Sequence, residues 1–274
     1  MNILGGNLMK LIINADDLGL THESNLGITK ALKMGYCTQT TFVVNSKFSD
    51  EGANLSFKNK FNHLVGLHLN LSEEMPLTEK IKNLKKYVNK DKLNYYPAYM
   101  NKSSYGISPL KTYFEEYTNL EFKMEIEAVR EELEAQIKKF IDYGFEPNHI
   151  DSHSNILMDL PVWLALKPLL LKYKFKSIRT VFDSFSNNDL YNKIYEEWLK
   201  AEISSLGMKS TSYSSSIQRY MKRKDEIQNL KILELYIHPI WKRQKLIDNF
   251  TNGILIKDNF SLIKELETTS FFQL

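Results

Sequence analysis

Short apolar runs alternate with longer amphipathic segments along most of the chain. This alternation is typical of strands followed by helices around a parallel sheet, and so predicts an α/β fold. The apolar runs predict strands at residues 10–15, 38–45, 63–71, 147–153, 177–180 and 232–239. The periodic segments predict helices at residues 24–34 and about 121–143, from Pro161 onward, and near 188–206, 243–250 and 258–267.

Residues 72–112 break this alternation. The segment is rich in Lys and Asn, shows no clear period, and contains five tyrosines: Tyr87, Tyr95, Tyr96, Tyr99 and Tyr105. A stretch of about forty residues without a convincing element is more typical of an insertion or a lid over a site than of a simple connection. A mobile, solvated excursion is the alternative. We expect a lid or insertion at about 72–112.

Composition and charge exclude several classes of protein. Apolar residues make up 43% of the 274-residue chain and charged residues 25%, as in ordinary globular proteins. The net charge of +3 comes without a Lys/Arg stripe, which argues against a nucleic-acid partner. No run of 18 apolar residues occurs, and residues 1–9 lack the features of a signal peptide. With Cys37 as its single cysteine, which we expect to be buried and inert, the protein is predicted to be cytoplasmic and not membrane-bound.

Groups that bind metals or move protons lie at the ends of the predicted strands. Asp16 and Asp17 follow the first strand, and because burying an unpaired carboxylate is costly, both should serve a purpose. His68, the stretch "HIDSH" at 149–153 and His238 lie in or at the ends of other strands. A lone strand histidine is more often a hydrogen-bonded core residue. In a barrel of parallel strands, however, the active site is assembled from several strand ends.

The "HIDSH" stretch allows a more detailed prediction. Side chains alternate along a strand, so residues 149, 151 and 153 share one face, with His153 nearest the C-terminal end. His153 is then best placed to reach a metal, while Asp151 can orient an imidazole by accepting its N–H. A buried polar network without a metal is the alternative.

A divalent ion explains the paired aspartates better than other chemistries do. One carboxylate can coordinate the ion while its neighbour acts as a base toward water. Asp17, His68 and His153 would supply three ligands and leave the open position of a catalytic site. The sequence has no G-x-S-x-G elbow, no P-loop, and no G-x-G-x-x-G after the first strand. One Asp and two His are acceptable to zinc, cobalt, nickel, manganese or magnesium, and the histidines favour the transition ions. We expect magnesium or zinc, with cobalt, nickel or manganese also possible.

Five stretches together resemble a known family. "NADDLGL", "GITKALKMGYCTQTTFVVN", "VGLHLNLSE", "PNHIDSH" and "ELYIHP" occur in the order and approximate spacing of the YdjC-like carbohydrate deacetylases, which include chitooligosaccharide deacetylase. The resemblance runs from about Lys10 to beyond His238. It implies one domain over residues 1–274 with a distorted TIM-like (β/α) barrel, similar to that of the polysaccharide deacetylases. It also implies metal-dependent removal of acetyl groups from N-acetylated amino sugars in short oligosaccharides.

The resemblance implies roles for individual residues. Asp16 would be the catalytic base and His238 the acid that protonates the departing amine. The metal ligands would be Asp17, His68 and His153. Residues expected to contact substrate or to support the ligands are Arg179, Asp151 and Asn45. Tyrosines of the 72–112 segment would suit the apolar faces of sugar rings.

Two departures from the family pattern keep other functions open. Family members commonly carry histidine where this chain has Asn155 and Leu157, so a catalytically weakened sugar-binding or regulatory protein on the same fold is one alternative. A metal-dependent hydrolase of another bond, such as a phosphate ester, is a second, although it would want more basic residues than Arg179. The partner expected is a small oligosaccharide substrate, and a homodimer is allowed.

Overall fold

The computed structural model describes residues 9–97, 120–180, 190–225, 230–251, 256–261 and 267–274. Among them, an eight-stranded sheet forms the centre, in the order β7-β6-β3-β2-β1-β9-β8, with β12 paired to β1. All its pairings are parallel. The strands are β1 (Lys10–Leu18), β2 (Gln39–Phe42), β3 (Val65–Leu69), β6 (His149–Ser152), β7 (Ser177–Ile178), β8 (Tyr213–Ser216), β9 (Ile232–Ile237) and β12 (Glu267–Thr269).

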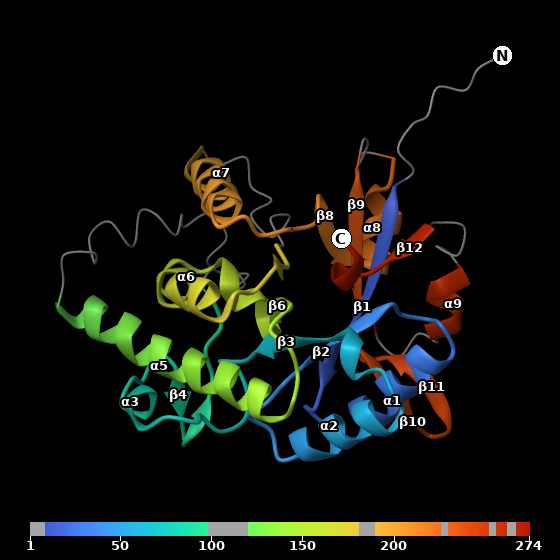
Figure 1. Cartoon of the computed structure of the whole chain (residues 1–274), viewed down its shortest axis with the longest axis horizontal. Coiled ribbons are helices and arrows are strands. Elements are labelled where there is room, and N and C mark those ends of the chain that lie inside the picture. Colours follow the sequence, from blue (N-terminus) through green and yellow to red (C-terminus); the bar gives the residue numbers. More distant parts are fainter. Residues whose placement is uncertain (1–8, 98–119, 181–189, 226–229, 252–255, 262–266) are drawn as a thin grey trace.

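Helices surround this curled sheet (Figure 1). The longer ones are α1 (His22–Lys33), α2 (Ser49–Lys58), α5 (Leu120–Asp142), α6 (Leu160–Tyr173) and α7 (Leu190–Ser205). The shorter ones are α3 (Glu79–Lys82), α8 (Ile217–Arg223) and α9 (Ile256–Ser261), with 3₁₀ turns at Asn62–Leu64, His153–Met158, Asn249–Thr251 and Phe271–Gln273. The edge strands approach each other, because Ile178 donates to the carbonyl of Lys209 just before β8 (2.9 Å). The predicted distorted (β/α) barrel is confirmed.

The burial of the elements follows from their sequences. Every residue of β1 after Lys10 is buried, as expected for a strand covered on both faces of a parallel sheet. In α5, the buried residues Val129, Leu133, Ile137 and Phe140 recur every three or four positions, so one stripe faces the core. Helix α1 begins two residues earlier than predicted because Thr21 and Ser24 form a capping box.

The segment after β9 was predicted wrongly. Residues 243–250 were expected to be helical, but β10 (Pro239–Lys242) and β11 (Lys245–Asp248) form an antiparallel hairpin. Arg243 and Gln244 connect them with φ of 49° and 58°, as a two-residue hairpin turn requires. The hairpin packs against α1, a long-range contact that overrides local preference. The helix expected at 258–267 is α9, which ends at Ser261, while Glu267 already lies in β12.

The described part of the 72–112 segment, residues 72–97, contains α3 and a small hairpin of β4 (Val88–Asn89) and β5 (Lys92–Leu93). Tyr87 and Tyr95 are buried, and their rings stack with centroids 4.3 Å apart. The expectation that these two tyrosines would face a sugar is therefore wrong, since they pack in the core. Tyr96 is 48% exposed, whereas Tyr99 and Tyr105 lie outside the described residues.

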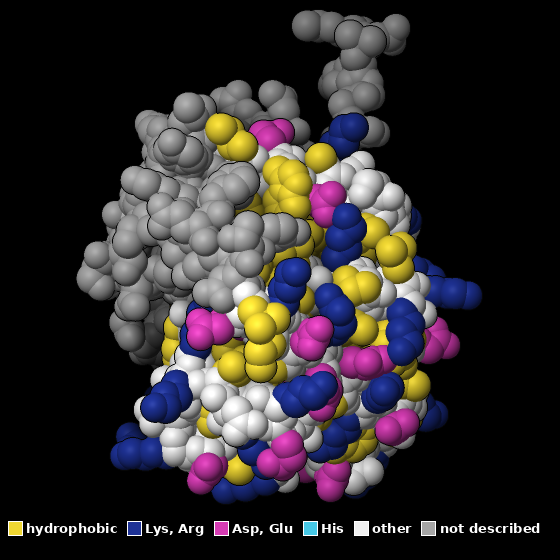
Figure 2. Space-filling model, turned by 90° about the vertical axis from the view of Figure 1, so that its left-hand side faces the viewer, with side chains coloured by type: hydrophobic (Ala, Val, Ile, Leu, Met, Phe, Trp, Pro, Cys, Tyr) yellow, Lys and Arg dark blue, Asp and Glu magenta, His cyan; other side chains and the backbone are white. Residues whose placement is uncertain are grey.

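Three further features concern the surface, the helices and the single cysteine. On the face drawn in Figure 2, basic and acidic side chains are interspersed over the described residues. In the described parts of the chain, none of the helices has both the length and the apolarity that crossing a bilayer requires. Cys37 is 5% exposed, and burial raises the pKa of its thiol, so it is the inert core residue expected.

Gly27 marks a close approach of α1 to β10, and we expect Gly27→Ala to destabilise the fold. A Cβ there would lie 2.4 Å from the carbonyl oxygen of Pro239 and 2.6 Å from Cα of Ile240. In an exposed helix interior, alanine is more favourable than glycine by about 1 kcal/mol. Overpacking against backbone atoms costs about 1–3 kcal/mol, so we expect the clash to outweigh the gain in helix propensity. Because the contacted atoms are backbone, we expect the upper end of this cost. Chemical denaturation should then show a net loss of about 2 kcal/mol of unfolding free energy.

The control is Gly35→Ala, where no atom lies within 4 Å and only the φ of +70° is unfavourable. We expect it to cost about 1 kcal/mol of backbone strain. A Gly27→Ala protein as stable as wild type would contradict the packing of α1 on β10.

Candidate active site

Asp16 and Asp17 lie within β1 rather than after it, which corrects the predicted end of this strand. The pairing of β1 with β2 shifts register between Ala15 and Leu18, and Asp17 has a φ of 76°. A bulge of this kind re-aims a side chain. Both carboxylates are nearly buried, at 4% and 9% exposure, yet they meet different partners.

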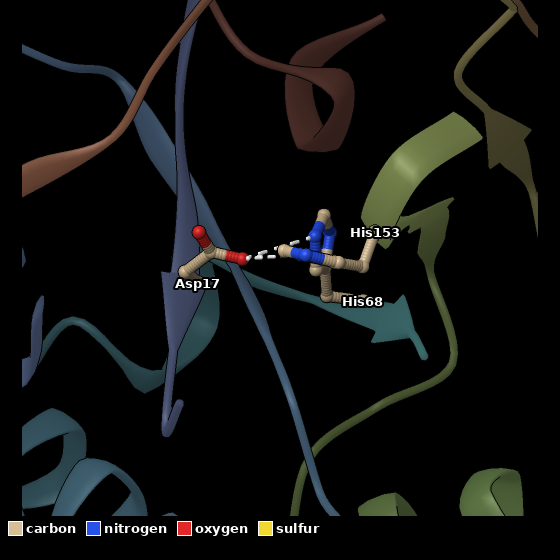
Figure 3. Close-up of side chains that lie close together, drawn as sticks. All are labelled: Asp17, His68 and His153. Atoms are coloured by element: carbon tan, nitrogen blue, oxygen red, sulfur yellow. Dashed lines mark hydrogen bonds and ion pairs between the residues drawn. The ribbon is translucent and has the colours of Figure 1, made fainter. Parts of the chain in front are cut away.

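Asp17 faces two histidines, which both lie on the side of its Oδ1 (Figure 3). Its Oδ1 is 3.0 Å from Nδ1 of His153 and 3.3 Å from Nε2 of His68. His68 belongs to β3, and His153 begins the 3₁₀ turn directly after β6. One potential ligand atom from each of the three residues lies within 4.8 Å of the other two. The structure therefore brings together the three predicted metal ligands.

A buried carboxylate fixes the orientation of His68. Its Nδ1–H donates to Oδ1 of Asp151 at 2.6 Å, and the hydroxyl of Thr41 donates to the other oxygen of Asp151 at 3.0 Å. Nε2 of His68 is buried without a hydrogen-bond partner and faces Asp17. An imidazole held this way offers its Nε2 lone pair to a cation. The orphaned nitrogen and the Asp/His/His donor set both fit a divalent ion.

The charges around the three ligands favour a cation. Burial by itself would lower the pKa of His68, but Asp151 and Asp17 raise it to about 9. Burial likewise opposes the charge on His153, while Asp17 and Glu73 raise its pKa to about 10. Burial would raise the pKa of Asp17, yet the two histidines hold it well below its ordinary value. The negative field that retains protons on these rings would also attract a divalent ion.

Asp16 is held by Arg179 rather than by the histidines. The guanidinium donates to both oxygens of Asp16, at 2.7 and 2.8 Å, and Asn14 donates to Oδ1 at 2.6 Å. Arg179 also contacts Asp151 at 3.0 Å and Glu234 at 2.8 Å, and is 3% exposed. Asp16 is thus a fixed carboxylate beside the candidate metal ligands, as a positioned base would be.

His238 lies directly after β9, on the side of Asp16. Its Nε2 is 3.8 Å from Oδ2 of Asp16, and its side chain is 19% exposed. Phe250 stacks on the imidazole with ring centroids 5.2 Å apart. Asp248 accepts the backbone N–H groups of His238 (3.3 Å) and Phe250 (3.1 Å), which fixes the chain on both sides of this stack.

Four other residues named from the sequence are not among the candidate ligands. Asn45 donates to the carbonyl of Met75 at 3.1 Å and so holds the loop after β3. Leu157 is 2% exposed and packs in the core, and Asn155 has a left-handed φ of 53° in the turn after His153. His149, the deepest of the "HIDSH" residues, contacts Ser177 at 3.0 Å and stacks on Phe271 at 3.8 Å between centroids.

His149 makes the stability of the protein depend on pH. Burial lowers the pKa of His149 to about 3, below the ordinary 6.5. The unfolded chain therefore takes up the proton first, so stability present above pH 6.5 is lost as the pH falls toward 3. We expect His149→Gln to remove about 2 kcal/mol of the fall in unfolding free energy between pH 6.5 and 4.5, as measured with urea.

The matched change is His63→Gln, which makes the same substitution at an exposed histidine. Equal slopes of unfolding free energy against pH for wild type and His149→Gln would contradict a neutral buried imidazole.

Several contacts of the site were missed from the sequence. Glu234 accepts from Arg179 and from the hydroxyl of Ser214 at 2.9 Å, and burial raises its pKa to about 7. Glu73 lies 3.5 Å from Nε2 of His153. A charged residue inside the apolar run "ILELYI" was the available signal for Glu234, because a buried charge needs a partner. Glu73 ends the stretch "VGLHLNLSE" quoted above, but that stretch did not indicate a contact with His153.

The arrangement of Asp17, His68 and His153 can now be compared with known proteins. A family model described as YdjC-like protein matches residues 10–268, nearly the whole chain. This chain belongs to the YdjC-like family. The matched region contains the three candidate metal ligands, so the site lies within the part of the chain that is YdjC-like.

Known relatives and one solved structure are similar to this YdjC-like chain over much of its length. It is 27% identical to a carbohydrate deacetylase of Clostridium beijerinckii, over 95% of this chain and 91% of that protein. A chitooligosaccharide deacetylase of Klebsiella pneumoniae is 30% identical over 56% of this chain and 52% of that protein. A crystal structure from Enterococcus faecalis V583, of a candidate cellobiose-phosphate cleavage protein, superposes with a TM-score of 0.66 at 21% identity, covering 96% and 98% of the two chains. The last likeness supports the fold.

Proposed function

We propose that this protein is a metal-dependent hydrolase that removes acetyl groups from N-acetylated amino sugars in short oligosaccharides. The observation that carries the proposal is the convergence of Asp17, His68 and His153. Nε2 of His68 makes no hydrogen bond and faces the carboxylate of Asp17 at 3.3 Å. The names of the relatives, carbohydrate deacetylase and chitooligosaccharide deacetylase, supply the substrate class.

Asp17, His68 and His153 would hold one divalent ion. Magnesium and zinc are the first choices, and the two imidazoles also suit cobalt, nickel and manganese. When bound, such an ion makes water a better nucleophile near neutral pH and polarises the amide carbonyl. Three protein ligands leave room for water and substrate.

Asp16 would take the proton of the attacking water. The two hydrogen bonds from Arg179 fix the direction of this carboxylate before the reaction. When Asp16 becomes neutral, Arg179 still faces the carboxylates of Asp151 and Glu234. The guanidinium is therefore not left as an unpaired buried charge during the reaction.

His238 would donate a proton to the departing nitrogen. An amine leaves poorly as an anion, and help from a general acid is commonly worth about 10²- to 10⁴-fold in rate. Its Nε2 lies 3.8 Å from Asp16, so base and acid stand at neighbouring positions of one site. Phe250 covers one face of the imidazole and limits its motion.

The alternatives gain less support. A phosphate-ester hydrolase would need free cationic groups, but Arg179 is engaged by three carboxylates. A weakened protein was suggested by Asn155 and Leu157, yet Leu157 lies in the core and the proposed base, acid and ligands are all present. We therefore favour an active deacetylase.

The test is acetate release. Purified protein stripped of metal is incubated with N-acetylated chitooligosaccharides of two to five sugars, alone and with Mg²⁺, Zn²⁺, Co²⁺, Ni²⁺ or Mn²⁺. We expect acetate only with an added ion, and none after a chelator is supplied. No acetate from any of a broad panel of N-acetylated sugars, in protein shown to bind the ion, would refute deacetylation. Phosphate release from phosphorylated sugars would point to an esterase instead.

A further inference from the structure

The two histidines of the candidate metal site turn different ring nitrogens toward Asp17. His68 presents Nε2 at 3.3 Å, whereas His153 presents Nδ1 at 3.0 Å. The nitrogens on the far sides of the rings therefore differ as well. Nδ1 of His68 meets Asp151 at 2.6 Å, and Nε2 of His153 lies 3.5 Å from Oε1 of Glu73. Each imidazole thus lies between Asp17 and a second carboxylate.

The backbone of Glu73 is held in place on both sides. Its N–H donates to Oδ1 of Asn70 at 3.1 Å, and its carbonyl accepts from Nδ2 of the same residue at 2.8 Å. Asn70 is itself fixed, because Gln136 on α5 bonds both its backbone N–H (3.0 Å) and its carbonyl (2.8 Å). The direction of the Glu73 side chain toward His153 therefore rests on a supported loop.

We propose that Glu73 is a positioning residue that accepts the Nε2–H of His153 and so commits Nδ1 of this ring to the metal ion. The inference rests on the metal centre of the proposed function and adds a second orienting carboxylate to it. A carboxylate behind a metal-binding imidazole fixes which nitrogen keeps its proton and raises the basicity of the other. The two histidine ligands would then bind as opposite tautomers, His68 through Nε2 and His153 through Nδ1.

The two orienting carboxylates differ in their exposure to solvent. The Asp151 side chain is fully buried, whereas that of Glu73 is 44% exposed. Solvent screening weakens the contact of Glu73, and its removal leaves no buried charge unpaired. His153 is therefore the ligand whose support can be changed without disturbing the barrel.

The first test reads the tautomers directly. Long-range ¹H–¹⁵N spectra of the zinc-loaded protein, labelled at histidine nitrogens, report which nitrogen of each ring carries a proton. We expect a proton on Nδ1 of His68 and on Nε2 of His153. Zinc bound by His153 through Nε2 would overturn the proposal while leaving the metal centre intact.

The second test compares adjacent glutamates. Glu73→Ala should weaken Co²⁺ binding about 10- to 100-fold, as loss of an orienting carboxylate commonly does. Glu74→Ala makes the same change one residue further along. It should stay within about twofold of wild type, since Glu74 is half-buried and, among the described residues, forms no ion pair with a proposed ligand. Equal affinities of the two variants would refute the role of Glu73.

The salt dependence of metal affinity distinguishes an orienting hydrogen bond from a general effect of negative charge. The affinity difference between Glu73→Ala and wild type should persist in 0.5 M salt, because screening at that ionic strength weakens long-range attraction but not a hydrogen bond. A difference that disappears would mean that Glu73 only adds negative charge. Wild-type protein that binds no divalent ion would instead contradict the proposed function itself, so the two failures are distinguishable.

Discussion

Asp17→Asn is expected to abolish tight binding of a divalent ion and, with it, hydrolysis. Asp17 is the carboxylate that both histidines face, at 3.0 and 3.3 Å, and it is the single negative charge among the three proposed ligands. The amide that replaces it is a poor ligand and carries no charge. Calorimetric titration with Zn²⁺ or Co²⁺ should show the affinity reduced by at least about 100-fold. Loss of a residue that only supports a ligand already costs about 10- to 100-fold, and loss of a ligand should cost at least as much.

Asp50→Asn serves as the control for this variant. Asp50 is exposed and accepts from the hydroxyl of Tyr143 at 2.6 Å, away from the site. The change also removes one negative charge, and we expect it to leave ion affinity unchanged. If Asp17→Asn bound the ion within threefold of wild type, Asp17 would not be a ligand.

Asp16→Asn should give the second large effect, with a different signature. We expect kcat to fall about 10²- to 10⁴-fold, the usual contribution of a general base, while ion affinity stays within a few-fold of wild type. Asn retains an oxygen for Arg179 but cannot accept a proton from water at neutral pH. Steady-state acetate release and metal titration on the same preparation measure the two quantities.

Stability must be followed in this variant because Asp16 is buried against a guanidinium. Removing one member of a buried pair can cost about 3–5 kcal/mol, although Asp151 and Glu234 remain to balance Arg179. Urea denaturation will show whether the protein is folded under assay conditions. A folded Asp16→Asn protein with wild-type kcat would exclude Asp16 as the base.

The sequence was most informative about the strand ends. Asp17, His68 and His153 lie far apart in the chain. The prediction that they meet required only that their strands belong to one parallel, barrel-like sheet. The structure pairs β1 with β2, β2 with β3 and β3 with β6, so the three positions reach one end of the sheet. Their roles as ligands remain a prediction.

Other features depend on contacts that no local pattern reveals. The bulge that separates Asp16 from Asp17 arises from pairing with β2, and the 239–248 hairpin gains its stability against α1. Tyr87 and Tyr95 appeared suited to a binding surface, but the fold places them in the core. Glu73 approaches His153 only because Asn70 and Gln136 hold its loop.

The most direct test of the metal centre is anomalous diffraction from crystals grown with Co²⁺. We predict one strong peak bonded to a carboxylate oxygen of Asp17, Nε2 of His68 and Nδ1 of His153, at about 2.0–2.2 Å from each, the distances common for such ligands. Crystals that hold Co²⁺ only elsewhere, or that show no peak among these three residues, would contradict the proposed site.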